Sequence, residues 1–393
     1  MKTAKKGAVE GMVEGTFGAA SKRRLSPPAS GSRAPGLTIL VTGSAGFIGF
    51  HVARRLLEQG DAVVGIDAYV PYYDLRIKQA RSKLLCMYPA YQEIKADLAG
   101  PDVMDEVIAQ HVPDAIVHLA EQPGVRHSLI KPGAFEQGNV RATLAVLEAV
   151  RKRKAGPGKS SREYRPKIVF GSSVSVYGDT QQLPFSEKDA PGNPLSLYAA
   201  TKRAGELLAG VYSRSHGFDC IGLRLCNVYG PWGRPDTAIW NFLLAILDGH
   251  PVDVYNQGGL KRDCIYIDDV VDGVMASLRS REAVSGEIIN LGSGVPAGLR
   301  EMIRMLEGAA SRTARLRMLP MQPGEAQTTW ADISKAKRLL DWQPRTDLRT
   351  GLRLFVDWFL ERRREDPLFG NLSDGMSGRT LSHGALDGAL QDR

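Results

Sequence analysis

Three side chains in the middle of the chain have the types and spacing of a catalytic group. Tyr198 and Lys202 stand four positions apart in a stretch of helical periodicity, so they share one helix face. The ammonium of Lys202 would lower the pKa of the Tyr198 phenol, and a phenolate can take the proton of an alcohol while hydride leaves the same carbon. Ser173 ends an apolar run and can hold the alcohol oxygen opposite the tyrosine. Together the three residues predict hydride transfer at a carbinol carbon.

A glycine-rich segment upstream predicts the site of the hydride acceptor. It lies between an apolar run at 37–41 and a helical stretch at 47–59. In this context glycines close a tight turn and bring backbone N–H groups and a helix N-terminus to a pyrophosphate. We therefore expect a dinucleotide at this turn. The residues concerned are Gly43, Gly46, Phe47, Ile48 and Gly49.

Acidic residues follow the next two predicted strands. Asp67 ends the run at 62–66 and is placed to accept hydrogen bonds from both hydroxyls of an adenosine ribose. Its carboxylate would repel a 2′-phosphate, which favours NAD over NADP. Asp97 and Leu98 follow a predicted third strand, and we expect them to border the adenine.

Strands and helices alternate around these residues. Alternation with short connections predicts an α/β fold, a Rossmann-type doubly wound parallel sheet. After residue 225 the elements mix with loops rich in Gly, Pro and Trp, which predicts a smaller C-terminal substrate-binding lobe. The expected strands are 37–41, 62–66, 115–119, 167–170 and 220–224, and the expected helices are about 102–111, 134–153 and 196–216.

The predicted domain organisation follows from composition along the chain. Apolar content and periodicity place a NAD-binding Rossmann domain at 37–225 and a substrate-binding lobe, interleaved with it, at 226–365. Three segments lack apolar periodicity: a disordered basic leader (1–36), a flexible insertion (152–166) and a disordered tail (366–393).

Charge and cysteine content exclude several classes of protein. The formal charge of +8 is concentrated in residues 1–36 (seven Lys/Arg, two Glu) and 151–167 (eight Lys/Arg, one Glu), which leaves a slightly acidic body. We therefore expect no nucleic-acid partner. The chain contains no run of eighteen apolar residues, so we expect no membrane span. No apolar stretch follows the first lysines, which argues against secretion. Four cysteines without paired metal spacing indicate no metal site and buried free thiols in a reducing cytoplasm.

Two polar residues of the sheet region have open roles. Asn139 precedes a helical run and can either hydrogen-bond a strand backbone or take part in catalysis. His118 ends a predicted core strand, where a structural role is favoured over proton transfer.

The chain resembles the extended short-chain dehydrogenase/reductase family and, within its nucleotide-sugar epimerases, the UDP-glucuronate 4-epimerases. The resemblance covers about residues 37–360. It is carried by Val41-Thr-Gly-Ser-Ala-Gly-Phe-Ile-Gly-Phe-His51, Tyr72-Tyr-Asp74, His118-Leu-Ala-Glu-Gln-Pro-Gly-Val-Arg126, Val228-Tyr-Gly-Pro-Trp-Gly-Arg-Pro-Asp236 and Tyr266-Ile-Asp-Asp269.

The resemblance implies roles for particular residues. Ser173, Tyr198 and Lys202 would be the catalytic group of a homodimeric enzyme. Arg234 would lie near the sugar carboxylate or the phosphates, and Arg262 would clamp the diphosphate, because a guanidinium suits both anions. Further substrate contacts are expected from Arg126, Ser175, Asn227, Val254, Tyr255 and Glu325, with the backbone of Val254 and Tyr255 reading uracil and Glu325 near the UDP ribose.

Three positions depart from the epimerase pattern. Glu121 replaces an alanine, Val174 a serine and Asn227 a threonine, and Asn227 makes its segment resemble decarboxylases and dehydratases. Those enzymes carry Glu, or Asp-Glu, where this chain has Val174 and Ser175, so simple epimerisation is favoured. UDP-glucuronate decarboxylase and UDP-glucose 4-epimerase remain alternatives. So does a non-enzymatic NAD-binding scaffold, which would be expected to lose Tyr198 or Lys202.

Overall fold

The structure is a computed structural model that describes residues 36–154, 164–280, 284–321 and 326–370. Most of the expected basic leader, insertion and C-terminal tail lies outside the described residues, and so does Glu325. The predictions for those segments therefore stay predictions.

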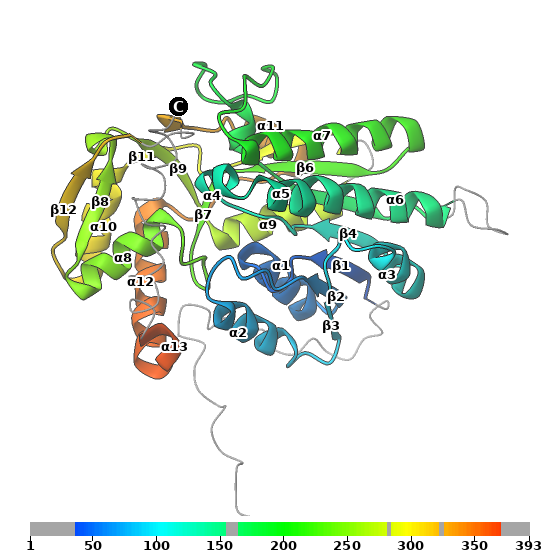
Figure 1. The fold of residues 1–393 in the computed structure, drawn as a ribbon, viewed down its shortest axis with the longest axis horizontal. Helices are drawn as coiled ribbons and strands as arrows, with labels where there is room; N and C mark the ends of the chain where they lie inside the picture. The colour runs from blue at the N-terminus through cyan, green and yellow to red at the C-terminus, as the bar shows by residue number, and fades with distance from the viewer. Residues whose placement is uncertain (1–35, 155–163, 281–283, 322–325, 371–393) are drawn as a thin grey trace, which may run out of the picture. The chain divides into compact units, whose positions relative to one another are not determined.

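Within the described residues, seven parallel strands form the central sheet, in the order β10-β6-β5-β4-β1-β2-β3 (Figure 1). The chain order reverses between β1 and β4, which is the switch point of a doubly wound sheet. The expected Rossmann-type fold is confirmed. The strands are β1 (Thr38–Thr42), β2 (Ala62–Asp67), β3 (Tyr91–Lys95), β4 (Ala115–His118), β5 (Lys167–Ser173), β6 (Cys220–Leu225) and β10 (Ile288–Leu291).

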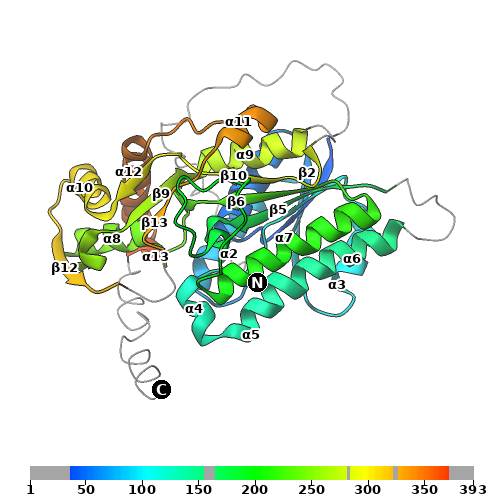
Figure 2. The ribbon, with the colours of Figure 1, turned by 90° about the horizontal axis from the view of Figure 1, so that it is seen from above.

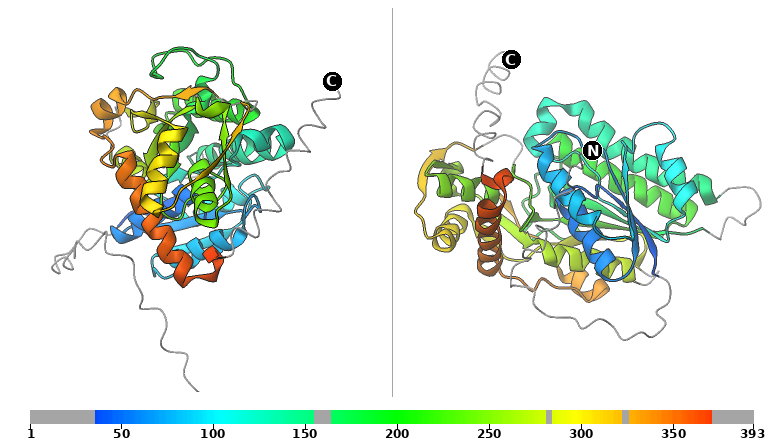
Figure 3. Two further views of the ribbon diagram at one scale, coloured as in Figure 1. Left: turned by 90° about the vertical axis from the view of Figure 1, so that its left-hand side faces the viewer. Right: turned by 90° about the horizontal axis from the view of Figure 1, so that it is seen from below.

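Alternating side chains of each strand fill two separate cores. In β1, Ile39 and Val41 pack into one apolar cluster while Leu40 packs into the other. Helices cover both faces, as Figures 2 and 3 show from other sides. One layer holds α1 (Phe47–Glu58), α2 (Leu75–Leu85), α9 (Ile267–Arg279) and α11 (Ser334–Leu340), and the other holds α3 (Val103–His111), α6 (Ala142–Lys154) and α7 (Leu197–His216).

The C-terminal lobe is built on two smaller sheets. A sheet of four strands pairs β7, β11 and β13 with β9, and β8 pairs with β12. Because β10 returns to the central sheet beside β6, the lobe is interleaved with the Rossmann part. Its strands are β7 (Asn227–Tyr229), β8 (Pro251–Tyr255), β9 (Lys261–Tyr266), β11 (Pro296–Gly298), β12 (Arg315–Leu319) and β13 (Thr328–Thr329), and its helices are α8 (Ala238–Asp248), α10 (Leu299–Ala310), α12 (Leu348–Glu365) and α13 (Pro367–Gly370).

Short helical segments connect the sheet to the loops above it. They are α4 (Val125–Ile130), α5 (Pro132–Phe135), the π-helix η2 (Glu136–Arg141) and the 3₁₀-helices η3 (Val174–Tyr177) and η4 (Asn256–Gly258).

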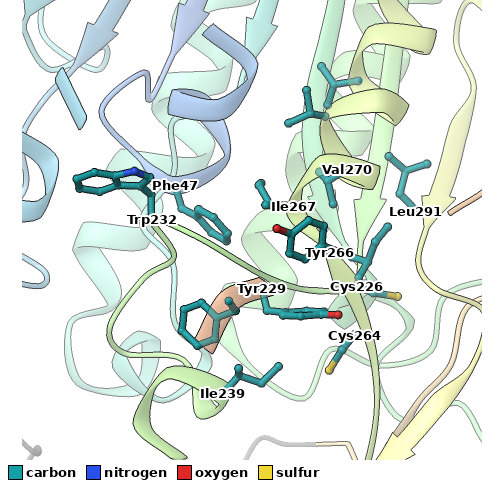
Figure 4. Close-up of a cluster of buried hydrophobic side chains, with 14 of the residues drawn as sticks. Phe47, Cys226, Tyr229, Trp232, Ile239, Cys264, Tyr266, Ile267, Val270 and Leu291 are labelled. Carbon is teal, nitrogen blue, oxygen red and sulfur yellow. The ribbon is translucent and has the colours of Figure 1, made fainter. Parts of the chain in front are cut away.

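A continuous apolar cluster joins the two lobes (Figure 4). Phe47 from the first turn of α1 and Trp232 from the loop after β7 belong to the same buried cluster as Tyr266 and Ile267. The loop that carries the Gly-Pro-Trp-Gly-Arg segment is therefore packed against the start of the nucleotide-binding helix.

Three boundaries and burials differ from the sequence-based expectation. Helix α6 continues to Lys154, past the start of the predicted insertion at 152. The predicted tail begins too early, because Phe369 of α13 is fully buried against Trp232, Trp240 and Trp358. Of the four cysteines, Cys86 is exposed rather than buried, since it caps the end of α2 at the surface.

We expect Phe369→Ala to lower the free energy of unfolding by about 3–5 kcal/mol, because it leaves an unfilled cavity among the surrounding aromatic rings. Urea unfolding followed by tryptophan fluorescence measures this. Val295→Ala, at an exposed site, is the control and should change stability by less than about 0.5 kcal/mol. Equal stability of the Phe369 variant and the wild type would show that α13 is not part of the core.

Candidate active site

The glycine turn after β1 has the geometry of a dinucleotide cradle. Gly43 adopts φ +71°, which favours glycine, and its N–H donates to the carbonyl of Ile66 (2.7 Å). A Cβ on Gly49 would lie 2.1 Å from the carbonyl oxygen of Gly43, so α1 can approach the turn only with glycine there. No side chain caps the helix at Gly46. Its first N–H groups, at Phe47 and Ile48, therefore fit a pyrophosphate.

Asp67 lies at the end of β2, beside an open hollow of about 430 Å³. Its Oδ1 accepts from Lys78 Nζ (2.9 Å) and from the N–H of Tyr69 (2.8 Å). Asp97 lines the same hollow and accepts from Gln137. The side chain of Leu98 is buried in the core, so only its backbone is available to border an adenine. The adenosine contacts of Asp67, Asp97 and Leu98 stay predictions.

The three predicted catalytic residues meet at the carboxyl edge of the sheet. Ser173 is the last residue of β5, and Tyr198 and Lys202 lie in the first turns of α7. Ser196 caps this helix by accepting from the N–H of Ala199 (3.1 Å). The Ser173 hydroxyl is close enough to the phenol to act on it by hydrogen bonding, and it also donates to Ser175 Oγ (2.9 Å).

A buried ion pair fixes α7 over the sheet. Glu206, one turn after Lys202, accepts from Arg224 of β6 (2.8 and 2.9 Å) and from Ser172 of β5 (2.7 Å). Burial opposes the charge of Glu206, but these partners outweigh it and hold its pKa below the usual value. The pair sets the register between the helix and Ser173.

Asn139 bridges three segments around the site. In the π-helix η2 it accepts from the N–H of Gln122 (2.7 Å), donates to the carbonyl of Gln122 (3.2 Å) and donates to Thr201 Oγ1 (2.9 Å). Of the two roles that the sequence left open, these contacts show backbone bonding, to the loop after β4 and not to a strand. π-helical turns are frequent at functional sites, where they redirect a side chain.

His118 is placed for structure. It lies between the hydroxyls of Thr42 (2.8 Å) and Thr143 (3.0 Å) at the end of β4. Burial, helped by the charge of Lys202, lowers its pKa to about 3, so the ring is neutral at ordinary pH.

The electrostatics of Tyr198 differ from the expectation. Lys202 Nζ pairs with Glu121 Oε2 (2.8 Å), and the Tyr198 hydroxyl donates to the same oxygen (3.4 Å). Burial and the charge of Glu121 raise the pKa of Tyr198 well above its usual value, while Arg234 and Ser173 oppose this. The expected net lowering is wrong for this structure, because burial, the largest cause, and the charge of Glu121 raise the pKa of Tyr198, and Glu121 also pairs with the ammonium of Lys202.

Arg234 lies near the catalytic residues: its charge opposes the rise in the pKa of Tyr198, and the charge of Glu121 helps to raise the pKa of Arg234. Its guanidinium makes two bonds to Asp236 (3.0 and 2.8 Å) and lies 5.9 Å from the centre of the Tyr72 ring. The expected contact of Arg234 with the sugar carboxylate or the phosphates stays a prediction, and no pattern in the sequence indicated its pairing with Asp236.

The other predicted substrate residues lie on several different elements of the structure. Arg126 of α4 stacks over the ring of Tyr255 at the end of β8, 5.0 Å away. The side chain of Val254 is buried in the lobe core, which leaves its backbone for contacts. Arg262 on β9 donates to the carbonyls of Lys261 and Gln327. Ser175 is beside Ser173, and Asn227 is exposed at the start of β7. Their roles in binding stay predictions.

Sequence reasoning missed Arg81, whose side chain is fully buried in α2. Its guanidinium donates to the carbonyls of Trp232 (3.1 and 2.6 Å), Gly233 (2.9 Å) and Ala45 (3.1 Å), and to the Tyr73 hydroxyl (2.7 Å). It ties the glycine turn to the loop that carries Arg234, where Trp232 adopts φ +57°. An arginine within an ordinary amphipathic helix gives no sequence signal of such a role.

The family model described as "NAD dependent epimerase/dehydratase family" matches residues 39–292, and this protein belongs to that family. Its match covers the glycine turn, the catalytic group and the loop of Arg234. NAD is the cofactor of the family, and the turn fits it. None of the helices in the described residues is long and apolar enough to cross a membrane.

Individual relatives are similar over nearly all of the described chain. UDP-glucuronate 4-epimerase 4 of Arabidopsis thaliana is 37% identical over 83% of this chain and 76% of that protein. The crystal structure of UDP-glucuronic acid 4-epimerase from Bacillus cereus, in complex with UDP-glucuronic acid and NAD, is 34% identical with a TM-score of 0.76, covering 83% of this chain and 99% of that one. A UDP-glucose 4-epimerase with UDP-glucose from Thermotoga maritima is 27% identical with a TM-score of 0.73, over 83% and 99%.

We expect Arg81→Lys to lower the free energy of unfolding by about 3 kcal/mol and to weaken NAD binding, because a single ammonium cannot satisfy the buried carbonyls on both sides. Urea unfolding and titration with NAD measure the two effects. Arg76→Lys is the control, since Arg76 is exposed on the same helix and pairs with Asp74 at the start of that helix. Unchanged NAD affinity in a destabilised Arg81 variant would contradict the link to the turn.

Proposed function

We propose that this protein is an NAD-dependent UDP-glucuronate 4-epimerase, an isomerase that interconverts UDP-glucuronate and UDP-galacturonate through a transient 4-keto sugar. The observation that carries the proposal is the meeting of Ser173, Tyr198 and Lys202 with Arg234 at one sheet edge. Its support is the similarity to enzymes named for this reaction, one of them solved with UDP-glucuronic acid and NAD.

NAD, held at the glycine turn and by Asp67, supplies an acceptor and donor of hydride for C4′ of the sugar. Tyr198 takes the proton from O4′ and later returns it, and Ser173 holds the same oxygen by a hydrogen bond. The 4-keto sugar turns within the pocket, so that C4′ is reduced on its other face. Arg234 is placed for the sugar carboxylate, where a guanidinium makes a forked contact.

Loss of CO₂ is the side reaction that a 4-keto uronate invites, because the intermediate is a β-keto acid. Val174 is buried and Ser175 carries only a hydroxyl, so the positions at the end of β5 offer no acid to carry the reaction further. This favours return of the hydride and simple epimerisation over decarboxylation.

A second candidate is UDP-glucose 4-epimerase. The salt bridge between Arg234 and Asp236 favours it, because this guanidinium already has one carboxylate partner and need not face a sugar carboxylate. The similarity to the UDP-glucose 4-epimerase of Thermotoga maritima supports this second candidate.

A homodimer through α6 and α7 is part of the proposal. These helices lie side by side on one face of the sheet (Figure 2), and they expose Leu144, Leu207 and Val211. Leu207 and Val211 share one face of α7, and such apolar patches are typical of protein interfaces. Light scattering should give about twice the 42.8 kDa of one chain. We further propose a cytoplasmic location, which cell fractionation would test.

We expect incubation with UDP-glucuronate to give UDP-galacturonate of unchanged mass, detected by mass spectrometry and NMR beside a parallel reaction with UDP-glucose. A pentose nucleotide would show decarboxylation, and turnover of UDP-glucose alone would favour the second candidate.

Tyr198→Phe should reduce kcat on the order of 10²–10⁴-fold while NAD still binds, because the variant loses the group that moves the O4′ proton. Tyr212→Phe, on the same helix but bonded to Glu148 away from the site, should keep wild-type turnover. Wild-type activity in the Tyr198 variant would reject the mechanism.

A further inference from the structure

Glu121 is held in the catalytic group by the backbone on both sides of it. The N–H of Ala120 donates to Thr42 Oγ1 (3.1 Å) at the end of β1, and Gln122 exchanges two bonds with Asn139. Asn139 in turn bonds to Thr201, whose hydroxyl donates to the carbonyl of Tyr198. The loop that carries Glu121 and the helix that carries Tyr198 are therefore one hydrogen-bonded unit.

The carboxylate of Glu121 contacts both catalytic residues of α7 through one oxygen. Oε2 lies 2.8 Å from Lys202 Nζ and 3.4 Å from the Tyr198 hydroxyl. The side chain of Lys202 is 10% exposed and that of Glu121 25%, so solvent screens this contact only in part. Lys202 is further fixed by donating to the carbonyl of Gly171.

Within the described residues, the charged and hydroxyl groups around the phenol come from five segments, the fifth being the loop before α2 that carries Tyr72. Glu121 follows β4, Lys202 lies on α7, Ser173 ends β5, and Arg234 precedes α8 with Asp236 and Tyr72 behind it. Arg234 is already paired with Asp236. Glu121 is therefore the carboxylate in direct contact with the phenol among the described residues, and it pairs with the ammonium that would otherwise favour phenolate.

We propose that Glu121 is a positioning residue for proton transfer: it holds Lys202 beside Tyr198 and, by opposing the charge of Lys202, sets the pH range in which the phenol gives up its proton. The proposal rests on the proposed function only for its turnover measurement. The proposal assigns a role to the position where the epimerase pattern has an alanine. The pH range in which the enzyme is active would then depend on the Glu121 side chain.

The charges around Tyr198 determine in which direction its pKa changes when the Glu121 carboxylate is removed. A carboxylate beside a phenol disfavours phenolate, so it raises the pKa of the phenol. Removal of the Glu121 charge leaves the ammonium of Lys202 uncompensated beside Tyr198 and favours phenolate. The acid limb of activity must then move to lower pH, and at a pH below both limbs the variant is about tenfold more active for each unit by which the limb has moved.

The test compares the pH dependence of kcat/KM for UDP-glucuronate in the NAD-bound wild type and in Glu121→Gln, which keeps the side-chain shape. We expect the acid limb to move down by at least one pH unit. Glu121→Asp, which keeps the charge, should keep the limb near the wild-type position. Glu136→Gln removes an exposed charge paired with Arg141 and is the control that should not move it.

A second readout needs no substrate. In the NAD-bound protein labelled with [¹³Cζ]tyrosine, the Tyr198 signal is assigned by its loss in Tyr198→Phe. Its titration midpoint should fall by at least one pH unit in Glu121→Gln or, if that variant does not fold, in Glu121→Ala. Circular dichroism and thermal melting establish folding of each variant.

The two readouts separate the possible failures. A uniform loss of activity with an unmoved acid limb and an unmoved Tyr198 midpoint would overturn the role of Glu121 and leave it as a structural ion pair. Absence of turnover of UDP-glucuronate by the wild type would reject the proposed function, while the NMR midpoint would still decide the proposal for Glu121.

Discussion

The buried contact between Glu206 and Arg224 is the constraint on which the catalytic geometry depends. Glu206 bonds to Arg224 on β6 and Ser172 on β5, so α7 can neither slide nor rotate without leaving a charge unpaired in the core. Loss of one partner of such a pair costs about 3–5 kcal/mol. Because Ser173 follows Ser172, and Lys202 stands one turn before Glu206, this contact sets the distance between the two halves of the catalytic group.

Parallel pairing gathers the remaining functional residues at the same edge. The ends of β1, β2 and β5 supply the glycine turn, Asp67 and Ser173, and the strand register places these ends together. The loop of Arg234 belongs to the C-terminal lobe, yet Arg81 fastens it to Ala45 in the glycine turn. A shift of the glycine turn therefore displaces the loop of Arg234, and the reverse, although the two segments are distant in sequence.

The sequence predicts the parts of this structure that depend on local pattern. Strands appear as short apolar runs, and the Tyr198–Lys202 spacing gives a shared helix face, so both are visible without a structure. Contacts between distant residues are not. The pairing of Glu121 with Lys202 depends on where the loop after β4 lies, and burial together with the charge of Glu121 raises the pKa of Tyr198 where the sequence predicted a lowering. Phe369 lies in a stretch of low apolar content, and its burial depends on rings from other parts of the chain, those of Trp232, Trp240 and Trp358.

The charges around Tyr198 are arranged as neutral pairs, Lys202 with Glu121 and Arg234 with Asp236. If Arg234 contacts the sugar carboxylate, as proposed above, a UDP-uronate must exchange partners with Asp236 instead of meeting an unpaired cation. The net gain of each new contact is then small, and discrimination between sugars depends on whether the incoming anion matches the fork of Arg234 better than Asp236 does. On that proposal, selectivity for the uronate depends on Asp236 as much as on Arg234.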